Sequence, residues 1–534
     1  MGRDCEVLRD RSIEGGWIFY PAAHKIRLAK ARAKKLLRFL NTALCSAALS
    51  LLPVVPLAAQ VHASEGQSDT AAVLADYDAM LSILRNDYAG WENKTADEKG
   101  EAFDRLATDT RLAIAADPSR FDALARELIG WFEDRHLNIG RIAGQRPVVQ
   151  ESDPWEGYDV EALRSQGRMI DADTVAAALA GARGTAGQWQ TFDGNYALAI
   201  IPDPLNPAQS IGVIGDSRSR AWAQGQVKFT LRPETDGTRV VYLMGDHSER
   251  EMTAQQLAAG DVLKLTDGET VVYLERVGTD NAALKERLFA PQDFSLTRLS
   301  DETLLLRLPN FSLDNRPVIE ALLAEHHDLL ENTPNLLIDL RYNNGGGDGA
   351  YAELMRYLYT RPIYSIGVEA LASKRNMDLM EQLLAEYRDD ISADTIVYIQ
   401  DLISEGRANP GAWVNPLEHG FSIETYPDVM PFPRRVGILT EGAGSSGDQF
   451  VIDSRASRKV TTFGKPTAGV IDYSNVVSSK LPSGNFKMSW PITRSLRLPE
   501  EPFDNVGVPP DVPFGEEIAD PIGYVQNWLE RQVD

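Results

Sequence analysis

The stretch LLIDLRYNNGGGDGAY, residues 336–351, decides the fold of the C-terminal half of this 534-residue chain. Its apolar run predicts a buried strand, and residues 348–359 predict a helix. Glycines 345–347 let the backbone turn sharply between the two and leave amide hydrogens beside the positive start of the helix. Such a junction can hold an anion or a developing oxyanion, and a plain tight turn is the alternative. No Gly-Lys-Ser/Thr follows, so the junction does not match a phosphate-binding P-loop.

A second junction, ILTEGAGSSGDQF at residues 438–450, repeats the order of strand, glycine-rich turn and helix, and adds hydroxyl groups. A serine at a helix start after a strand exposes its oxygen, and neighbouring amides can stabilise negative charge on an attacked carbonyl. Capping of the helix is the alternative role for such a serine. The order Gly444-Ser445-Ser446-Gly447 is one residue short of Gly-x-Ser-x-Gly, so an α/β-hydrolase is not predicted.

Around these junctions the chain divides into regions of different periodicity. Residues 291–534 alternate strands and helices, which predicts an α/β fold class for this part. Residues 146–290 predict a β-rich middle domain, because QVKFTL, RVVYLM, DVLKL and TVVYLER are joined by Asp-Gly turns. Residues 64–145 space apolar side chains three and four apart, which predicts helices. The second helix begins at Asp117-Pro118 and places His136 near its C-terminal end.

Residues 1–63 are expected to be a signal peptide and leader. The basic segment KIRLAKARAKKLLRFL precedes the apolar, small-residue run NTALCSAALSLLPVVPLAA, and VHA offers a cleavage site near Ala63, with Ala59 as a second choice. A retained membrane anchor is the alternative, but Asn41, Pro53 and Pro56 interrupt the apolar run. The expected location is therefore periplasmic or secreted, with no membrane span in the mature chain.

Charge and cysteine content exclude several classes of function. The chain carries 54 Lys and Arg against 77 Asp and Glu, and the leader holds ten of the former and four of the latter, which leaves −29 on residues 64–534. An acidic surface of this kind repels phosphate backbones, so nucleic acid is not an expected partner. Cys5 and Cys45 both lie in the leader. Disulfides, thiolate zinc sites and a cysteine nucleophile are therefore excluded from the mature chain.

Taken together, five motifs resemble those of the S41 family of serine peptidases, which includes C-terminal processing proteases and the tricorn core protease. The resemblance covers the helical N-terminal region and residues 297–512, and it leaves out the β-rich middle. It implies a crotonase/ClpP-like core of ββα units behind an N-terminal helical bundle, a peptide or protein substrate, and no metal or cofactor. The motifs are IDLRYNNGGG (338–347), GILTEGAGSSGDQF (437–450), GKPTAG (464–469), DNVGVPPDV (504–512) and FEDRHLNI (132–139).

The resemblance also implies roles for single residues. Processing proteases carry a lysine after the last glycine of GKPTAG, and Val470 stands there, so the chain is similar to the tricorn-like branch with a histidine base. Its motifs imply Ser445 as nucleophile, with Asp448 in the family's acidic position, and His136 as base. Asp504 would orient the base. The oxyanion hole is implied at the amide of Ser446 and that of Gly345 or Gly346.

Two positions depart from the family pattern. Asp504 stands where tricorn-like enzymes carry glutamate, and Arg135 stands where they carry serine. Arg135 is a candidate contact for a substrate carboxylate, and Asp134 is the alternative residue to orient His136. A catalytically inactive S41-fold binding protein, as among vertebrate retinoid carriers, is the alternative function. The remaining mature histidines belong to no motif: His247, His326, His327 and His419.

Overall fold

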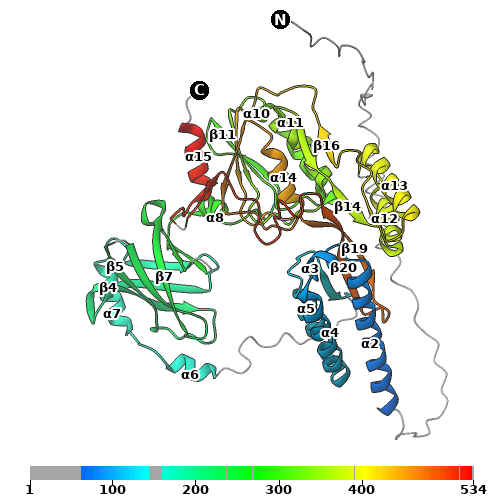
Figure 1. Cartoon of the computed structure of the whole chain (residues 1–534). Helices are drawn as coiled ribbons and strands as arrows, with labels where there is room; N and C mark the ends of the chain where they lie inside the picture. The colour runs from blue at the N-terminus through cyan, green and yellow to red at the C-terminus, as the bar shows by residue number, and fades with distance from the viewer. Residues whose placement is uncertain are drawn as a thin grey trace, which may run out of the picture. The chain divides into compact units, whose positions relative to one another are not determined.

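A computed structural model describes residues 62–142 and 159–531, except 236, 268, 269, 390 and 516, with side chains from Thr70 onward. The chain divides into a unit of residues 1–64 and a unit of residues 65–534, and the second unit is described below. Apart from its last two residues, the predicted leader lies outside the described part of the chain. No helix among the described residues is long and apolar enough to cross a membrane. The described fold is mixed α/β, as the sequence predicts for the C-terminal half (Figure 1).

The two glycine-rich junctions extend from neighbouring parallel strands of one six-stranded sheet. Asp339, at the end of one strand, lies opposite Leu439, at the end of the next. Because parallel strands present their carboxyl ends at one edge, both junctions emerge side by side. The sheet order is β10 (Ser295–Arg298), β11 (Thr303–Arg307), β12 (Asn335–Asp339), β17 (Arg435–Leu439), β18 (Val460–Gly464) and β21 (Val512–Pro513), and only the β10–β11 pair is antiparallel.

Helices cover both faces of this sheet, since alternate strand residues point to opposite sides. Leu336 and Ile338 of β12 face a core completed by α9 (Arg316–Glu325), α11 (Ala352–Leu358) and α14 (Ser446–Ser454). Leu337 faces the other way, against α15 (Pro521–Arg531). The short elements η3 (Leu313–Asn315), α10 (His327–Leu330) and η4 (Asp348–Ala350) complete the connections.

A second sheet joins the N-terminal helices to the C-terminal part of the chain. It runs in the order β1 (Asn138–Arg141), β20 (Phe486–Ser495), β14 (Val368–Leu371) and β15 (Trp413–Val414), with β19 (Tyr473–Lys480) also paired to β20. Figure 1 shows the blue N-terminal helices beside β19 and β20. The helices sharing this core are α2 (His62–Asn86), α3 (Trp91–Lys94), α4 (Glu98–Ala116), α5 (Phe121–Gly130), α12 (Lys374–Tyr387) and α13 (Ala393–Ala408).

The segment that carries His136 differs in detail from the sequence prediction. Asp117 does cap a helical start, because its side chain accepts from Ser119 N of the short helix η1 (Pro118–Arg120), which leads into α5. However, α5 ends at Gly130, so His136 lies in the turn before β1 rather than at a helix end. Pairing of β1 with β20, from Asn138 opposite Ser489, fixes this turn against the C-terminal part of the chain.

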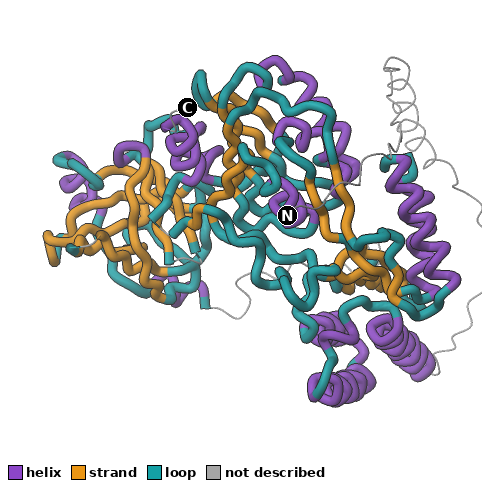
Figure 2. The backbone as a smooth tube through the Cα atoms, turned by 45° about the horizontal axis from the view of Figure 1, so that its top comes forward, coloured by secondary structure: helices purple, strands orange, loops and turns teal. Residues whose placement is uncertain are grey.

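The middle region forms a closed eight-stranded barrel (orange strands in Figure 2). The strands on either side of the predicted Asp-Gly turns, 236–237 and 267–268, pair as hairpins. Asp236 and Gly268 themselves lie outside the described residues. The strands are β2 (Gly187–Thr191), β3 (Tyr196–Asp203), β4 (Asn206–Ser217), β5 (Val227–Glu234), β6 (Gly237–Leu243), β7 (Glu249–Leu257), β8 (Val262–Thr266) and β9 (Val271–Arg276), with α6 (Val160–Ser165), α7 (Ala172–Ala180), η2 (Ala258–Gly260) and α8 (Ala282–Leu288) beside them in sequence.

One buried cation, Lys228, lies inside this barrel and is only 1% exposed. Its Nζ lies 3.9 Å from the ring centroid of Trp222, 4.4 Å from that of Tyr196 and 4.8 Å from that of Tyr242. It donates to the backbone oxygen of Met244 at 3.3 Å. Burial lowers the pKa of Lys228 to about 7. In this poorly solvated place, aromatic faces and one carbonyl oxygen are the groups that stabilise its ammonium.

A separate two-stranded ribbon, β13 (Ile363–Ile366) with β16 (Phe421–Glu424), packs on α14. Its cross-strand pairs Tyr364–Ile423 and Ile366–Phe421 are exposed.

Candidate active site

Ser445 is held in an unusual backbone conformation at the start of α14. It is the N-cap residue of this helix, with φ 57° and ψ −117°. A residue with a side chain adopts such a conformation at a cost in free energy, and sharp strand-to-helix turns of this kind present a nucleophile. The Oγ of Ser445 lies 3.3 Å from Nε2 of His136. Ser445 therefore occupies the capping position and also faces an imidazole.

Asp448 fixes the backbone on both sides of this serine. Its Oδ2 accepts from Ser445 N at 2.7 Å and from Val470 N at 3.0 Å, and its Oδ1 accepts from Gly469 N at 3.0 Å. Burial raises the pKa of Asp448 above its usual value, and the three amides oppose this by favouring the carboxylate. Asp448 therefore ties the GKPTAG loop to the start of α14 and does not contact the imidazole.

The first glycine-rich junction packs directly against Ser445. A Cβ on Gly345, where φ is 71°, would lie 2.5 Å from Gly444 O and 2.7 Å from Ser445 Cβ. The amide of Gly345 donates to Asn343 Oδ1 at 2.8 Å, so it is already engaged. The amides of Gly346 and Ser446 donate to no other group within the described ranges. Of the two glycines implied for an oxyanion hole, Gly346 has the free amide, whereas Gly345 lets the first junction pack closely against Ser445.

His136 is oriented by a backbone carbonyl. Its Nδ1 lies 2.6 Å from the oxygen of Tyr473, the first residue of β19. A carbonyl oxygen only accepts, so Nδ1 carries the proton, and in a neutral ring Nε2 is then the acceptor. This is the tautomer that can receive the proton of the Ser445 hydroxyl. The side chain is half-buried.

Asp504 does not reach the imidazole, so the expectation that it orients His136 directly needs correction. Its Oδ1 accepts from Ile471 N at 3.0 Å and from Asp472 N at 2.9 Å. The Nδ1 position where an orienting acid would bind is taken by Tyr473 O. Burial, together with the charges of Asp134 and Asp472, raises the pKa of Asp504 to about 7, although the amides of Asp472 and Ile471 oppose this shift.

Asp134, the alternative orienting acid, contacts the backbone of His136 and not its imidazole. Its Oδ1 accepts from His136 N at 2.9 Å, and its Oδ2 accepts from the Tyr88 hydroxyl at 2.8 Å. The carboxylate thus closes the turn that carries the base. Burial, together with the Asp134 carboxylate, raises the pKa of Tyr88 well above its ordinary value, so the phenol stays a donor.

Arg135 is exposed, and its Nη1 lies 3.5 Å from Ala468 O in the GKPTAG loop that Asp448 ties to Ser445. Its guanidinium therefore lies beside this loop and is open to solvent.

The other histidines lie apart from this site. His247 stacks on Trp222 in the barrel, His326 contacts Leu322 O and His327 contacts the Tyr357 hydroxyl. His419 stacks on Phe421 of the exposed ribbon. Within the described ranges, no three acidic, histidine or cysteine side chains are grouped to hold a metal ion.

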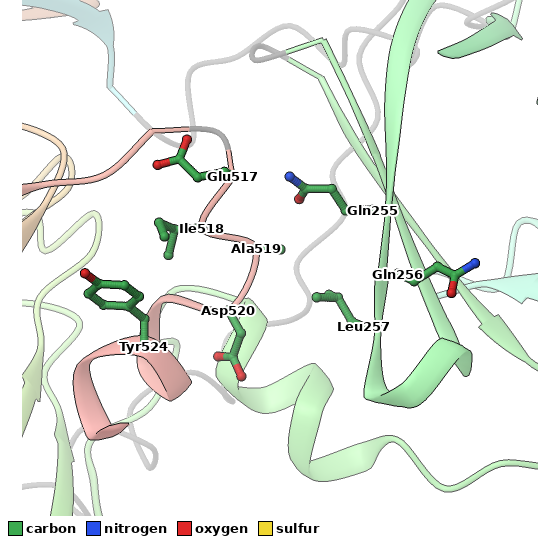
Figure 3. A pocket seen from close by; sticks show the side chains of 8 residues that line it. All are labelled: Gln255, Gln256, Leu257, Glu517, Ile518, Ala519, Asp520 and Tyr524. Atoms are coloured by element: carbon green, nitrogen blue, oxygen red, sulfur yellow. The ribbon is translucent and has the colours of Figure 1, made fainter. Parts of the chain in front are cut away.

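A pocket of about 450 Å³ lies between β7 and residues 517–524, and none of its lining residues belongs to the Ser445 site (Figure 3).

Sequence reasoning missed the part played by Tyr473. What it contributes is a carbonyl oxygen, which every residue type possesses, so no residue identity could have indicated it. Its side chain is held from the N-terminal helices, where Asn93 Nδ2 donates to the hydroxyl at 3.1 Å and Lys94 Nζ lies 5.3 Å from the ring centroid.

Comparison with known proteins connects this geometry to a family. Residues 302–514 match the model of Peptidase family S41. This range includes Ser445, both glycine-rich junctions and Asp504, but it does not include His136. The chain is also similar, at 25% identity over 211 residues, to a 3-dehydroquinate dehydratase of Halobacterium salinarum, with 40% of this chain and 72% of that protein covered.

Two solved structures give the scale of structural likeness. Mature CPAF has a TM-score of 0.45 at 13% identity, covering 87% of this chain and 96% of that one. The photosystem II D1 C-terminal processing protease has a TM-score of 0.31 at 12% identity, covering 84% and 94%.

Proposed function

We propose that this chain, a serine peptidase of family S41, cleaves peptide bonds through an acyl-enzyme formed on Ser445. The observation that carries the proposal is the 3.3 Å approach of Ser445 Oγ to His136 Nε2. The two residues lie 309 positions apart in the chain, in segments that only the fold brings together. A hydroxyl is a weak nucleophile near neutral pH, and a base at this distance can accept its proton.

In the first step the Ser445 oxygen attacks the substrate carbonyl while Nε2 of His136 takes the hydroxyl proton. The imidazolium that forms keeps its hydrogen bond from Nδ1 to Tyr473 O, which holds the ring in place. His136 then gives the proton to the leaving amine. A water molecule, deprotonated by the same ring, hydrolyses the ester and restores the serine.

The oxyanion of the tetrahedral intermediate would be bound by the amides of Ser446 and Gly346. Both amides are unengaged, and Gly345 packs against Ser445 closely enough to bring the two junctions together. Backbone donors fixed before the reaction stabilise developing charge without reorganisation, which makes them a large contribution to catalysis.

The parallel order β11, β12, β17, β18 with helices between successive strands supports a crotonase/ClpP-like core of repeated ββα units for residues 291–534. In this proposal residues 64–145 carry the base and residues 146–290 form a separate β-rich domain.

Arg135 is proposed to contact a carboxylate of the substrate, because it is an exposed cation beside the GKPTAG loop. Arg135→Ala should raise KM for a peptide with a free C-terminal carboxylate near the cleaved bond and leave KM unchanged for its amide. An equal rise in KM for both peptides would contradict this role of Arg135.

The basic and apolar leader supports a periplasmic or secreted location, with residues 1–63 removed. N-terminal sequencing of the protein recovered from the periplasm or medium should begin near residue 60 or 64. A mature chain that still begins at Met1 would contradict it.

A fluorophosphonate probe tests the catalytic proposal, because it reacts with a serine hydroxyl that is activated as a nucleophile. The wild type should be labelled, Ser445→Ala should not be labelled, and Ser446→Ala should be labelled because only its amide is required. A folded wild type that does not react would favour the alternative of an inactive S41-fold binding protein.

A further inference from the structure

Asp472 and Asp504 form a reciprocal clamp beside the proposed site. Asp504 Oδ1 accepts from Asp472 N at 2.9 Å, and Asp472 Oδ2 accepts from Asp504 N at 2.8 Å. Each carboxylate also accepts a second amide, from Ile471 and from Phe503 respectively. Four backbone donors thus join the segment before β19 to the segment before β21.

The clamp ends at the residue that orients the base. Tyr473 follows Ile471 and Asp472 directly, so fixing their two amides holds the backbone immediately before Tyr473, two peptide bonds from the one that contains its carbonyl. That carbonyl lies 2.6 Å from His136 Nδ1. From the other side, Asn505 Nδ2 donates to Glu133 O at 2.8 Å, which ties the residue after Asp504 to the turn that carries the base.

We propose that Asp504 is a positioning residue, which acts with Asp472 through the backbone to hold the Tyr473 carbonyl against His136. This inference rests on the proposed function, in which His136 is the base. In this role Asp504, the acid of the DNVGVPPDV motif, acts as a hydrogen-bond acceptor near Tyr473 and makes no contact with the imidazole.

The charges around the clamp make this positioning depend on pH. Asp504 is faced by the carboxylates of Asp134 and Asp472 and by the phenols of Tyr88 and Tyr473, and Asp472 is in turn near the buried guanidinium of Arg497. Burial and these carboxylates raise the pKa of Asp504 to about 7. An ionised carboxylate accepts amide hydrogen bonds more strongly than a neutral carboxyl. The clamp should therefore tighten as pH rises through 7.

Two substitutions separate an acceptor role from a charge role. Asp504→Ala removes both hydrogen bonds, and we expect kcat to fall about 100-fold with KM little changed, the size typical of a misplaced catalytic group. Asp504→Asn keeps an oxygen that can accept both amides, and it should restore kcat to within about tenfold of the wild type. A direct orienting acid would instead make Asp504→Asn as inactive as Asp504→Ala.

Asp511→Ala is the matched control, since Asp511 Oδ2 accepts from Thr462 N and Oγ1 at 2.9 and 2.8 Å in a loop that does not contact His136. It should leave kcat unchanged, so a loss of kcat equal to that of Asp504→Ala would assign the effect to general loosening and overturn the proposal. The pH profile gives a further readout. The acid limb of kcat should have a smaller slope in Asp504→Asn than in the wild type, because one titrating group is gone. An unchanged slope would contradict the pH part of the inference.

Labelling of the wild type by fluorophosphonate tests the proposed function separately from this inference. If the wild type reacts but Asp504→Asn and Asp504→Ala lose activity equally, the positioning role fails and the serine mechanism stands. If the wild type does not react, ¹⁵N NMR of the His136 ring still decides the inference. The Nδ1-protonated tautomer should persist in Asp504→Asn and be lost in Asp504→Ala, and its persistence in both variants would overturn the clamp.

Discussion

His136 Nε2 lies 3.3 Å from Ser445 Oγ, although His136 is outside residues 302–514, which match family S41. The proposed nucleophile and its proposed base therefore come from separately packed parts of the chain. The base depends on the turn closed by Asp134 and on the pairing of β1 with β20.

Replacing His136 tests whether the proposed base comes from outside residues 302–514. His136→Ala should lower kcat by about 10³-fold or more, because general-base assistance and the orientation of the proton are lost together. Peptide hydrolysis under saturating substrate measures the effect. His419→Ala, at an exposed histidine that stacks on Phe421 of the ribbon, should behave as the wild type. Equal losses in both variants would argue that His136 is not the base.

The strained backbone that presents the Ser445 hydroxyl should lower the stability of the fold. Its φ of 57° and ψ of −117° suit glycine, so Ser445→Gly should be more stable than Ser445→Ala by about 0.5–1 kcal/mol, although both lack the nucleophile. Urea denaturation of the two variants measures the difference in free energy of unfolding. If the alanine variant is as stable as the glycine variant, the backbone at Ser445 is unstrained.

Gly345 should tolerate no side chain. A methyl group there would lie within 3 Å of Gly444 O, Ser445 Cβ and Ser446 N, and φ is 71°. Gly345→Ala should lower the free energy of unfolding by about 1–3 kcal/mol and also reduce fluorophosphonate labelling, because Ser445 and the Ser446 amide must move. Gly349→Ala is the control, since its Cβ would lie 3.7 Å from Leu313 Cδ2. Similar behaviour of the two variants would argue against close packing of the two junctions.

Lys228 should make the stability of the barrel depend on pH above neutrality. Burial lowers its pKa to about 7, below the value near 10.4 of an unfolded chain. Between these two values the unfolded state binds more protons than the native state, so the free energy of unfolding should rise with pH. The rise is up to about 4 kcal/mol between pH 7 and pH 10. Lys228→Met should abolish it in urea denaturation measured across this range, and a variant with the same slope as the wild type would contradict it.

Both glycine-rich junctions could be predicted from the sequence because their signals are local. An apolar run such as LLIDL, followed by glycines and a helix pattern, is sufficient to predict strand, turn and helix. The placement of Ser445 beside Gly345 then follows from the parallel pairing of β12 with β17. The motif FEDRHLNI indicated His136, and the structure places its Nε2 3.3 Å from Ser445 Oγ.

The support of His136 could not be predicted in the same way. Tyr473 acts through its carbonyl, and Asp504 contacts amides of Ile471 and Asp472. These contacts depend on long-range pairing of strands such as β1 with β20, and no periodicity or residue type reports them. Four of the middle strands, β5, β6, β8 and β9, could be predicted from their alternation, but the pairing of β2 with β9 that closes the barrel is also long-range.

Pairing of β1 with β20 has a consequence for the order of events during synthesis. His136 emerges from the ribosome long before Ser445, but its turn is anchored to residues 486–489 and its ring to Tyr473, near the end of the chain. Until that last part has been made and docked, the imidazole has no fixed position beside the serine. In the proposed mechanism, hydrolytic competence therefore requires this last part of the chain, and a nascent chain that ends before Tyr473 lacks the contact that orients His136.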